Sequence, residues 1–181
     1  MTNAAEDNLM GDPGAPPPFP GPPFPGPPVN RADEPARVLA ANRYLVLGTA
    51  DGNGNPWVTP VFYAPLDPHR LVWVSSPDSR HSRNISQRAA IAITVFDSTV
   101  EVGQAVAAYF DADAGPLSPD ETEAALRALN SRLPHAKRLS GEDLHPRGPM
   151  VVYRADLRRR YVLVRGGDRE FGNAVDMTMQ I

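Results

Sequence analysis

Runs in which apolar and polar residues alternate begin at residue 43, and they predict strands. The segment DGNGN, residues 51–55, places glycine and asparagine where a tight hairpin turn needs them. Residues 65–70 read as a second turn. Two tight turns between three strands indicate an antiparallel meander. Its predicted strands are residues 43–50, 57–63 and 71–75.

The rest of the chain continues with more strands than helices. An apolar fourth strand is predicted over residues 89–96 and a fifth over residues 100–112. Because hairpins rather than helices join the first strands, the pattern favours a small antiparallel barrel over a parallel doubly wound sheet. Closing strands are predicted over residues 150–156, 160–165 and 174–179.

Two or three short helices are expected beside these strands. Asp33 is placed to cap a helix over residues 35–42. A second helix is expected to begin near Arg80, after a segment crowded with serine, aspartate and proline. The sequence SPDE at residues 118–121 is a capping box with proline at the first helical position, and it predicts a third helix.

Residues 1–30 differ in composition from the rest of the chain. Within residues 11–28, 14 of 18 residues are proline or glycine, including the tandem pentads FPGPP. Proline removes an amide donor and fixes φ, so we expect a disordered, polyproline-like leader followed by one domain over residues 31–181. The leader is either a docking peptide for an aromatic groove or a spacer. The spacer is favoured, because the residues that flank the pentads add no recognisable binding motif.

Charge and composition exclude several classes of protein. The formal net charge is −3, all of it from three carboxylates in the first 30 residues, and the remaining chain is balanced. A balanced surface argues against nucleic acid as a partner. The absence of cysteine excludes disulfides, thiolate zinc sites and iron–sulfur clusters. Four histidines without ligand spacing predict no metal site, and the lack of a signal peptide or a long apolar run predicts a cytoplasmic protein without a membrane partner.

One segment combines groups that bind an anion. A strand ends in Ser75 and Ser76, and the following helix begins with Arg80 and His81. The free amides and positive dipole end of a helix favour an anion, and a guanidinium binds phosphate in a bidentate manner. The alternative is that the arginine is an exposed helix charge and Ser76 only a cap. From the residues alone, the two interpretations carry equal weight.

Two other features have a functional and an ordinary interpretation. Pro60 interrupts the apolar strand 57–63, which indicates a sheet edge or a bulge where a ligand approaches the backbone, or simply an edge shielded against aggregation. Asp111 and Asp113 share one face of a predicted strand. The functional interpretation is an acid/base couple or a cation site. The ordinary interpretation is a solvated strand face. The solvated face is favoured, because no third ligand type lies nearby.

The order of these segments resembles the pyridoxamine 5'-phosphate oxidase-like superfamily of FMN-binding split β-barrels. The resemblance rests on the helix at residues 35–42, then YLVLGT, WVTPV, VWVSS, SRHSRNI and the apolar strand 90–96. It covers residues 35–97 well, residues 100–181 loosely, and the leader not at all. It implies a six-stranded antiparallel split β-barrel with flanking short helices, and a homodimer with two FMN sites at its interface.

The resemblance also assigns roles to individual residues. Arg80 and His81 match the family's basic pair that holds the FMN phosphate, and Ser75, followed by Ser76, matches the hydroxyl position along the ribityl–phosphate path. Gln104 matches a glutamine that touches the flavin, although an alternative register places Val106 there, and Tyr161 falls near a position where the family often has tryptophan. The strand whose backbone contacts the isoalloxazine ring corresponds to Thr59, Pro60 and Val61.

Departures from the family pattern argue against oxidation of vitamin B6 phosphates. Members with that activity carry a lysine where this chain has Ala64, and an Arg-x-His element where residues 173–176 read NAVD. His81 replaces the more usual lysine of the basic pair. A histidine near its unperturbed pKa is partly charged at neutral pH, so a pH-sensitive phosphate grip is expected.

The leading hypothesis is therefore an FMN-dependent oxidoreductase in which the cofactor supplies the chemistry. No catalytic side chain is assigned, and Trp57 or Phe62 is expected to line the substrate side. The first alternative is a deazaflavin-dependent enzyme, in which Arg83 and Arg88 contact the longer charged tail of that cofactor. The second is a non-catalytic protein that holds flavin or haem, or that has lost its ligand. The sequence does not indicate the substrate.

Overall fold

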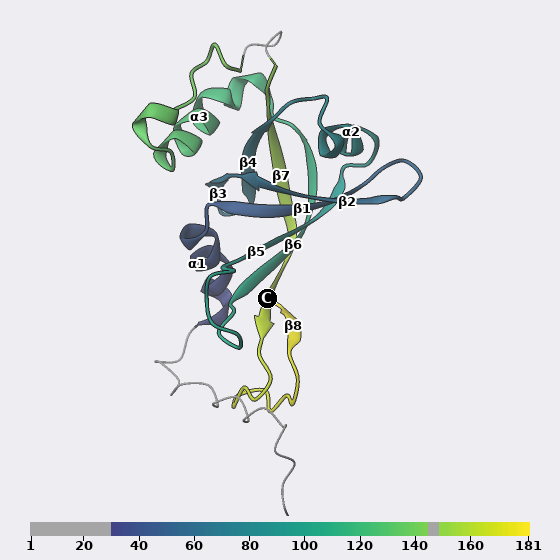
Figure 1. The fold of residues 1–181 in the computed structure, drawn as a ribbon, viewed down its shortest axis with the longest axis vertical. Coiled ribbons are helices and arrows are strands. Elements are labelled where there is room, and N and C mark those ends of the chain that lie inside the picture. Colours follow the sequence, from purple (N-terminus) through teal and green to yellow (C-terminus); the bar gives the residue numbers. More distant parts are fainter. Residues whose placement is uncertain (1–29, 145–148) are drawn as a thin grey trace, which may run out of the picture.

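The computed structural model describes residues 30–144 and 149–181, and one antiparallel sheet organises them (Figure 1). The predicted leader therefore lies outside the described residues except for Asn30. The helices are α1 (Glu34–Ala41), α2 (Arg80–Gln87) and α3 (Thr122–Ser131). The strands are β1 (Tyr44–Ala50), β2 (Pro56–Phe62), β3 (Ala64–Asp67), β4 (Arg70–Ser75), β5 (Ala90–Phe96), β6 (Ala107–Pro116), β7 (Val151–Val164) and β8 (Met177–Gln180).

The strand order is β2-β1-β5-β6-β7-β4-β3, and β8 pairs with the end of β7. All pairings are antiparallel, and the sheet curls until β2 approaches β4. This arrangement confirms the predicted mainly β, split-barrel class. The described sheet has eight strands rather than six, because β3 and β8 add short strands to it.

The inner face of the curled sheet forms the main core. Trp73 of β4 is fully buried and stacks on Tyr153 of β7, with 5.8 Å between the ring centroids. Leu45 and Leu47 of β1 and Phe110 of β6 are buried against the same core. A second, smaller core lies where α3 packs on β3 and β4, on the opposite face. The helices α1 and α2 contribute buried residues to the main core, and α2 lies by the β1–β2 hairpin (Figure 1).

A predicted turn and a predicted strand are wrong in their boundaries. Residues 65–70, expected as a turn, contain β3 and the start of β4. The strand expected over residues 100–112 begins only at Ala107. Asp97 accepts hydrogen bonds from the amide and hydroxyl of Thr99, a local turn that ends β5, and Gly103 has a φ of 85°. This turn chemistry delays the return strand.

The two closing strands predicted over residues 150–156 and 160–165 are one 14-residue strand, β7. The polar residues between them remain extended because the strand continues its pairing with β6, with Leu157 opposite Ala112 and Arg159 opposite Asp111. Ion pairs of Arg158 with Asp113 and of Arg159 with Asp111 cross the same two strands. The predicted strand over residues 174–179 is the shorter β8.

The positions of the helix starts were predicted correctly, but the capping hydrogen bonds expected at α1 and α3 were not. A short 3-10 turn, Arg31–Asp33, precedes α1, and the Asn30 side chain accepts from the amide of Ala32, whereas Asp33 makes no capping hydrogen bond. Pro119 opens the α3 region as predicted, but Ser118 donates to the Asp120 carboxylate and caps no amide. Within the described ranges, no helix is long and apolar enough to cross a membrane.

Candidate functional site

The end of β4 and the start of α2 lie together, as the sequence predicted. Ser75 is the last residue of β4, and Arg80 is the first residue of α2. Ser79 caps the helix, because its Oγ accepts from the amide of Ser82 at 3.3 Å. The Ser76 hydroxyl accepts from the amide of Asp78 at 3.2 Å and so shapes the connecting turn. Ser76 is therefore a turn residue, and the cap satisfies the Ser82 amide, so the amides that remain for a ligand at this helix end are those of Arg80 and His81.

His81 is buried beneath this turn and is 7% exposed. Its Nε2 lies 2.8 Å from the Ser75 hydroxyl and 3.1 Å from the Ser79 hydroxyl. Burial lowers the pKa of the His81 imidazole, because the charged form loses its hydration. This lowered pKa argues against the expected partly charged, pH-sensitive grip. The imidazole lies within hydrogen-bond distance of two serine hydroxyls at the start of α2.

Arg80 supplies the positive charge of this region. Its guanidinium lies over the ring of Trp57 in β2, 4.4 Å from the centroid. A cation–π contact does not consume the N–H donors of a guanidinium, which can still bind an anion. Arg80 makes no ion pair within residues 30–144 and 149–181. The side chain therefore rests against β2 and has unused hydrogen-bonding capacity.

Hydrogen bonds fix α2 to the β1–β2 hairpin. Asn84 of α2 donates to the Thr49 hydroxyl at 3.0 Å, and Thr49 donates to the carbonyl of Trp57 at 3.3 Å. The amide of Gly52 donates to the Gln87 side chain at 2.8 Å, and a Cβ at Gly52 would lie 2.9 Å from the same oxygen. The positions of Arg80 and Trp57 are thus set by one connected unit.

Sequence reasoning missed Thr49 and Asn84 as positioning residues. Both fall inside motifs that carried the family resemblance, YLVLGT and SRHSRNI, but they are 35 positions apart. In the sequence, the only indication was that Thr49 is a polar residue inside an otherwise apolar strand. Arg83, a proposed contact for a cofactor tail, donates to the carbonyl of Asp78 and is used within its own helix.

The strand β2 lies at one end of the sheet order, which confirms that Pro60 marks an edge. Thr59 pairs with Leu47, and both side chains face the inside of the curled sheet, as does the buried Val61. The Thr59 hydroxyl is buried and finds no hydrogen-bond partner among the described residues. A buried hydroxyl without a hydrogen-bond partner lowers the stability of the fold, and a polar ligand atom beside it would remove that cost.

Gln104 does not join the other candidates within one chain. It lies in the loop between β5 and β6, where its side chain accepts from Arg165 at 3.3 Å. Thr94 of β5 pairs with Val46 of β1, so the end of β5 lies beside the start of β1. The residues around Trp57 lie beside the opposite end of β1. Val106, the alternative in another register, lies in the same loop and is exposed.

The paired carboxylates of β6 have an ordinary explanation. The Asp111 carboxylate lies 2.7 Å from Arg159, and the Asp113 carboxylate lies 2.7 Å from Arg158. The hydroxyl of Tyr161 also donates to Asp111 at 3.2 Å. These ion pairs support a solvated strand face rather than an acid/base couple. No metal-binding group of three or more side chains is found among the described residues.

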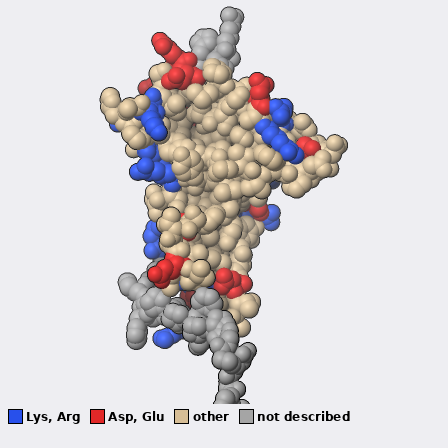
Figure 2. All heavy atoms as spheres, viewed as in Figure 1, with Lys and Arg blue, Asp and Glu red and all other residues tan. Residues whose placement is uncertain are grey.

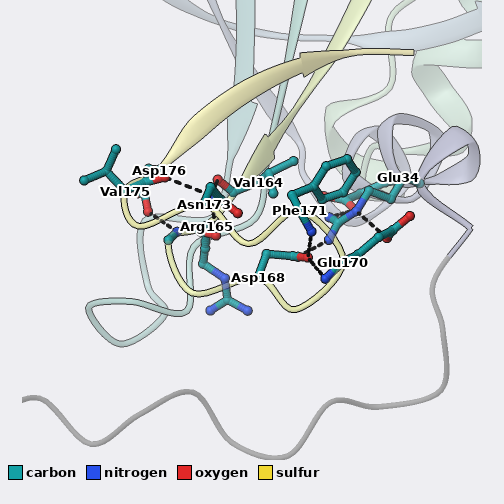
Figure 3. Close-up of polar contacts among 11 residues, drawn as sticks. Glu34, Val164, Arg165, Asp168, Glu170, Phe171, Asn173, Val175 and Asp176 are labelled. Atoms are coloured by element: carbon teal, nitrogen blue, oxygen red, sulfur yellow. Dashed lines mark hydrogen bonds and ion pairs between the residues drawn. The ribbon is translucent and has the colours of Figure 1, made fainter.

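A second polar cluster lies at the far end of the molecule (Figure 3). Arg31 pairs with Asp168, approaches Glu34 at 3.6 Å and lies 5.4 Å from the ring centroid of Phe171. Figure 3 shows Glu34, Asp168, Glu170 and Phe171 converging from α1 and the loop before β8. Burial raises the pKa of the Glu34 carboxyl, against the opposing effect of Arg31. The cluster joins the two ends of the described chain.

Charge is scattered over the surface drawn in Figure 2, where small blue and red patches interrupt a largely uncharged face. Apolar side chains are exposed on the outer face of β2, β1 and β5. Tyr44 is 63% exposed, Val58 61% and Phe96 44%. Tyr44 contacts Phe62 edge to face, with 6.1 Å between the ring centroids. The outer sheet face is therefore the main exposed apolar surface of these three strands.

Comparison with known proteins gives one family match. The sequence profile described as pyridoxamine 5'-phosphate oxidase matches residues 32–162. No match was found among curated protein sequences. Similar solved structures include a haem storage protein from Vibrio cholerae, at 18% identity and a TM-score of 0.59, with 71% of this chain and 92% of that chain covered. An FAD-binding protein from Mesorhizobium loti is 19% identical with a TM-score of 0.53, and 69% and 88% are covered. These similarities show a shared fold.

Proposed function

Because this chain belongs to the pyridoxamine 5'-phosphate oxidase family, we propose that it binds FMN between α2 and β2 and acts as a flavin-dependent oxidoreductase. The observation that carries this proposal is the Arg80 guanidinium at the start of α2, which rests on Trp57, while the Ser75 hydroxyl at the end of β4 is held 2.8 Å from Nε2 of His81, the next residue of the same helix. A cation, a hydroxyl and free helix amides together form the chemistry that binds a phosphate monoester.

The residues present fit the remainder of a flavin as well. The hydroxyl of Thr59 is buried without a partner among the described residues, and β2 is an edge strand of the described sheet. Both are groups that the polar edge of an isoalloxazine ring can satisfy, along the stretch Thr59, Pro60 and Val61. Arg80 and Ser75 would hold the phosphate, while His81 orients the hydroxyls. A bound flavin supplies hydride or electron transfer at its N5 position.

The surroundings of Trp57 and Phe62 indicate which of the two is the better candidate to line the substrate pocket. Trp57 lies beneath Arg80, so it belongs to the phosphate end of the site. Phe62 lies at the other end of β2, against Tyr44 and the smaller core. Phe62 is therefore the better candidate for a wall of the substrate pocket. The described residues offer no buried acid/base couple near it, so the proposal names no proton donor.

Oxidation of vitamin B6 phosphates is not part of the proposal. Ala64, at the position of the family's lysine, is buried in β3. In the segment NAVD, Asn173 donates from its side chain to the carbonyls of Arg165 at 2.9 Å and Val175 at 2.8 Å. That segment fixes the loop before β8 and presents no cation to a substrate phosphate.

A homodimer is the second part of the proposal. The exposed apolar face of β2, β1 and β5 is the kind of surface that a partner covers. A second copy would also resolve the position of Gln104, which lies too far along the sheet to join Arg80 in its own chain. Gln104 would then contact flavin only across the dimer interface. Sedimentation of the purified protein with and without FMN tests this part.

The visible spectrum of the purified protein tests the function. We expect the resolved blue absorption of oxidised FMN, released by a chaotrope, and bleaching on addition of NADH or NADPH. Bound FMN that no donor reduces would support a non-catalytic flavin carrier. A Soret band would indicate a haem-binding protein instead. A colourless protein that takes up no added flavin would contradict the proposal.

A further inference from the structure

The edge strands of the described sheet are β2, β3 and β8, and they differ in how they are protected. Two of them contain proline: Pro56 and Pro60 lie in β2, and Pro65 lies in β3, which also ends in Asp67. The strand β8 reads MTMQ and is followed by Ile181, so it contains neither proline nor charge. Proteins use proline and charge on a sheet edge to prevent it from pairing with another strand. The edge of β8 lacks this protection.

The hydrogen bond that follows β8 shows which of its backbone groups point away from β7. The amide of Ile181 donates to the carbonyl of Arg160 at 3.1 Å. In an antiparallel pair, alternate residues direct both backbone groups to the same neighbour, so the two methionines of β8 also bond to β7. The amides and carbonyls of Thr178 and Gln180 therefore point outward, where no strand of the described sheet pairs with them.

The loop before β8 holds this strand in place (Figure 3). The Asn173 side chain donates to the carbonyl of Val175 at 2.8 Å, and Asp176 accepts from the amide of Gly166 at 2.8 Å. An edge that is already ordered loses little conformational entropy when another strand is added to it. The strand also lies away from α2, where the proposed phosphate site is located (Figure 1). The edge is therefore a separate feature of the molecule.

A second copy of the same strand fits this edge. When two β8 strands pair antiparallel about a two-fold axis at Met179, Thr178 of each copy lies opposite Gln180 of the other. This register uses the outward backbone groups of both residues and forms about four hydrogen bonds, two for each pair. Because the strand carries no charge, no like charges oppose one another. The proline-rich part of the leader fits less well, since 14 of 18 residues in 11–28 are proline or glycine and proline has no amide to donate.

We propose that β8 is an association surface at which two copies of this chain pair edge to edge and join their sheets. This surface does not depend on the proposed flavin site, and it is distinct from the outer face of β2, β1 and β5. In the same register, Ile181, which is 38% exposed, lies opposite Met177 of the other copy. Two short strands form a small interface, so association through β8 alone is weak and depends on the protein concentration.

A cysteine placed on the two-fold axis tests the pairing, because the chain contains no cysteine of its own. Non-hydrogen-bonded partners in an antiparallel pair have Cα atoms about 4.5 Å apart, within the range of a disulfide. We expect full-length Met179→Cys, oxidised with diamide, to run mostly at twice the chain mass on a non-reducing gel. Met177→Cys, the control in the same strand, should remain at the single mass, because its two copies lie about 14 Å apart at roughly 3.4 Å per residue.

A proline in β8 provides a second, independent measurement. Thr178→Pro removes an outward amide and leaves the hydrogen bonds to β7 intact, because those come from the alternate residues. It should abolish the cross-link when combined with Met179→Cys, whereas Thr178→Val, which keeps the amide, should not. Without any cysteine, Thr178→Pro should also lower the average mass measured by sedimentation at high protein concentration.

Each outcome decides for or against the pairing. A cross-link that forms in Met179→Cys alone and is lost with Thr178→Pro supports it. Absence of the cross-link overturns it, whether the edge is then open or covered by the leader or by another peptide. Equal cross-linking of Met177→Cys and Met179→Cys, or a cross-link that survives Thr178→Pro, indicates random collision and overturns it as well. An unchanged sedimentation profile of Thr178→Pro has the same consequence.

Discussion

The molecule has two dense polar regions, and they differ in how their arginines are used. At the α2 end, Arg80 lies on an aromatic ring, and its N–H groups have no carboxylate partner among the described residues. At the opposite end, Arg31 pairs with Asp168 and lies near Glu34 and Phe171 (Figure 3). The first region has unused hydrogen-bonding capacity, whereas in the second the carboxylates of Asp168 and Glu34 pair with Arg31, and the buried Arg31 Nε is left without a hydrogen bond among the described residues.

This difference teaches that a concentration of polar groups does not by itself indicate a binding site. The Arg31 cluster holds more charge than the α2 end, yet each of its charges has a neighbour of opposite sign and it connects distant parts of the chain. The α2 end has the exposed Arg80, and nearby β2 adds a buried Thr59 hydroxyl that finds no partner among the described residues. We therefore expect substitutions to separate the two regions into one that binds and one that stabilises.

The largest expected effect is on ligand binding at Arg80. Arg80→Ala removes a charge-assisted contact to phosphate and should weaken FMN binding by about 2 kcal/mol, roughly thirtyfold, with little change in the free energy of unfolding. Fluorescence quenching of FMN measures the affinity. Arg127→Ala, whose side chain pairs with Glu123 on the exposed face of α3, should bind FMN normally. Equal losses in both variants would show that the site is misplaced.

The next effect is on stability at the other end. Arg31→Ala leaves the carboxylates of Asp168 and Glu34 without their common partner, and because these groups are partly exposed we expect a loss of about 1–2 kcal/mol of unfolding free energy. Urea denaturation measures it. Arg169→Ala, in the same loop at an exposed position, is the matched control and should unfold like the wild type. A large loss of FMN affinity in Arg31→Ala would contradict the claim that this cluster stabilises the fold without binding the ligand.

At Thr59 we expect a smaller effect, in which a substitution weakens FMN binding but does not lower the stability of the free protein. Thr59→Val removes a buried hydroxyl that lacks a partner, so the free protein should be equally stable or gain up to about 1 kcal/mol. FMN should bind about fivefold more weakly, since a hydrogen bond to the flavin is lost. Thr178→Val on the exposed side of β8 controls for the added methyl group. Unchanged FMN affinity in Thr59→Val would remove β2 from the proposed site.

The smallest expected effect is a pH dependence from His81. Its pKa is lower in the folded protein than in the unfolded chain, so the unfolded chain binds protons more readily as the pH falls below about 6.5. The stabilisation is complete above that pH and is lost as the pH falls toward the folded pKa. His81→Gln should flatten this decline in urea titrations at pH 5.5 and 8. His135→Gln, at an exposed position, should retain it. An unaltered slope in His81→Gln would mean that the imidazole is not held neutral by burial.

Much of the fold follows from local patterns, whereas the site's details depend on contacts across the chain. The hairpin turn after β1 and the start of α2 were predicted correctly, because glycine, asparagine and capping serine act on their immediate neighbours. The continuity of β7 was missed, since it depends on pairing with β6, where the partners of Leu157 and Arg159 lie more than 40 positions away. The burial of His81, which lowers its pKa, was missed for the same reason: burial is a property of the packed structure.

The most direct test of the central claim is a crystal structure of the protein grown with FMN. The account predicts the phosphate within hydrogen-bond distance of the Arg80 guanidinium and the Ser75 hydroxyl, with the ring edge along Thr59 to Val61. FMN bound elsewhere, with Arg80 still resting on Trp57 and the Thr59 hydroxyl still without a partner, would contradict it.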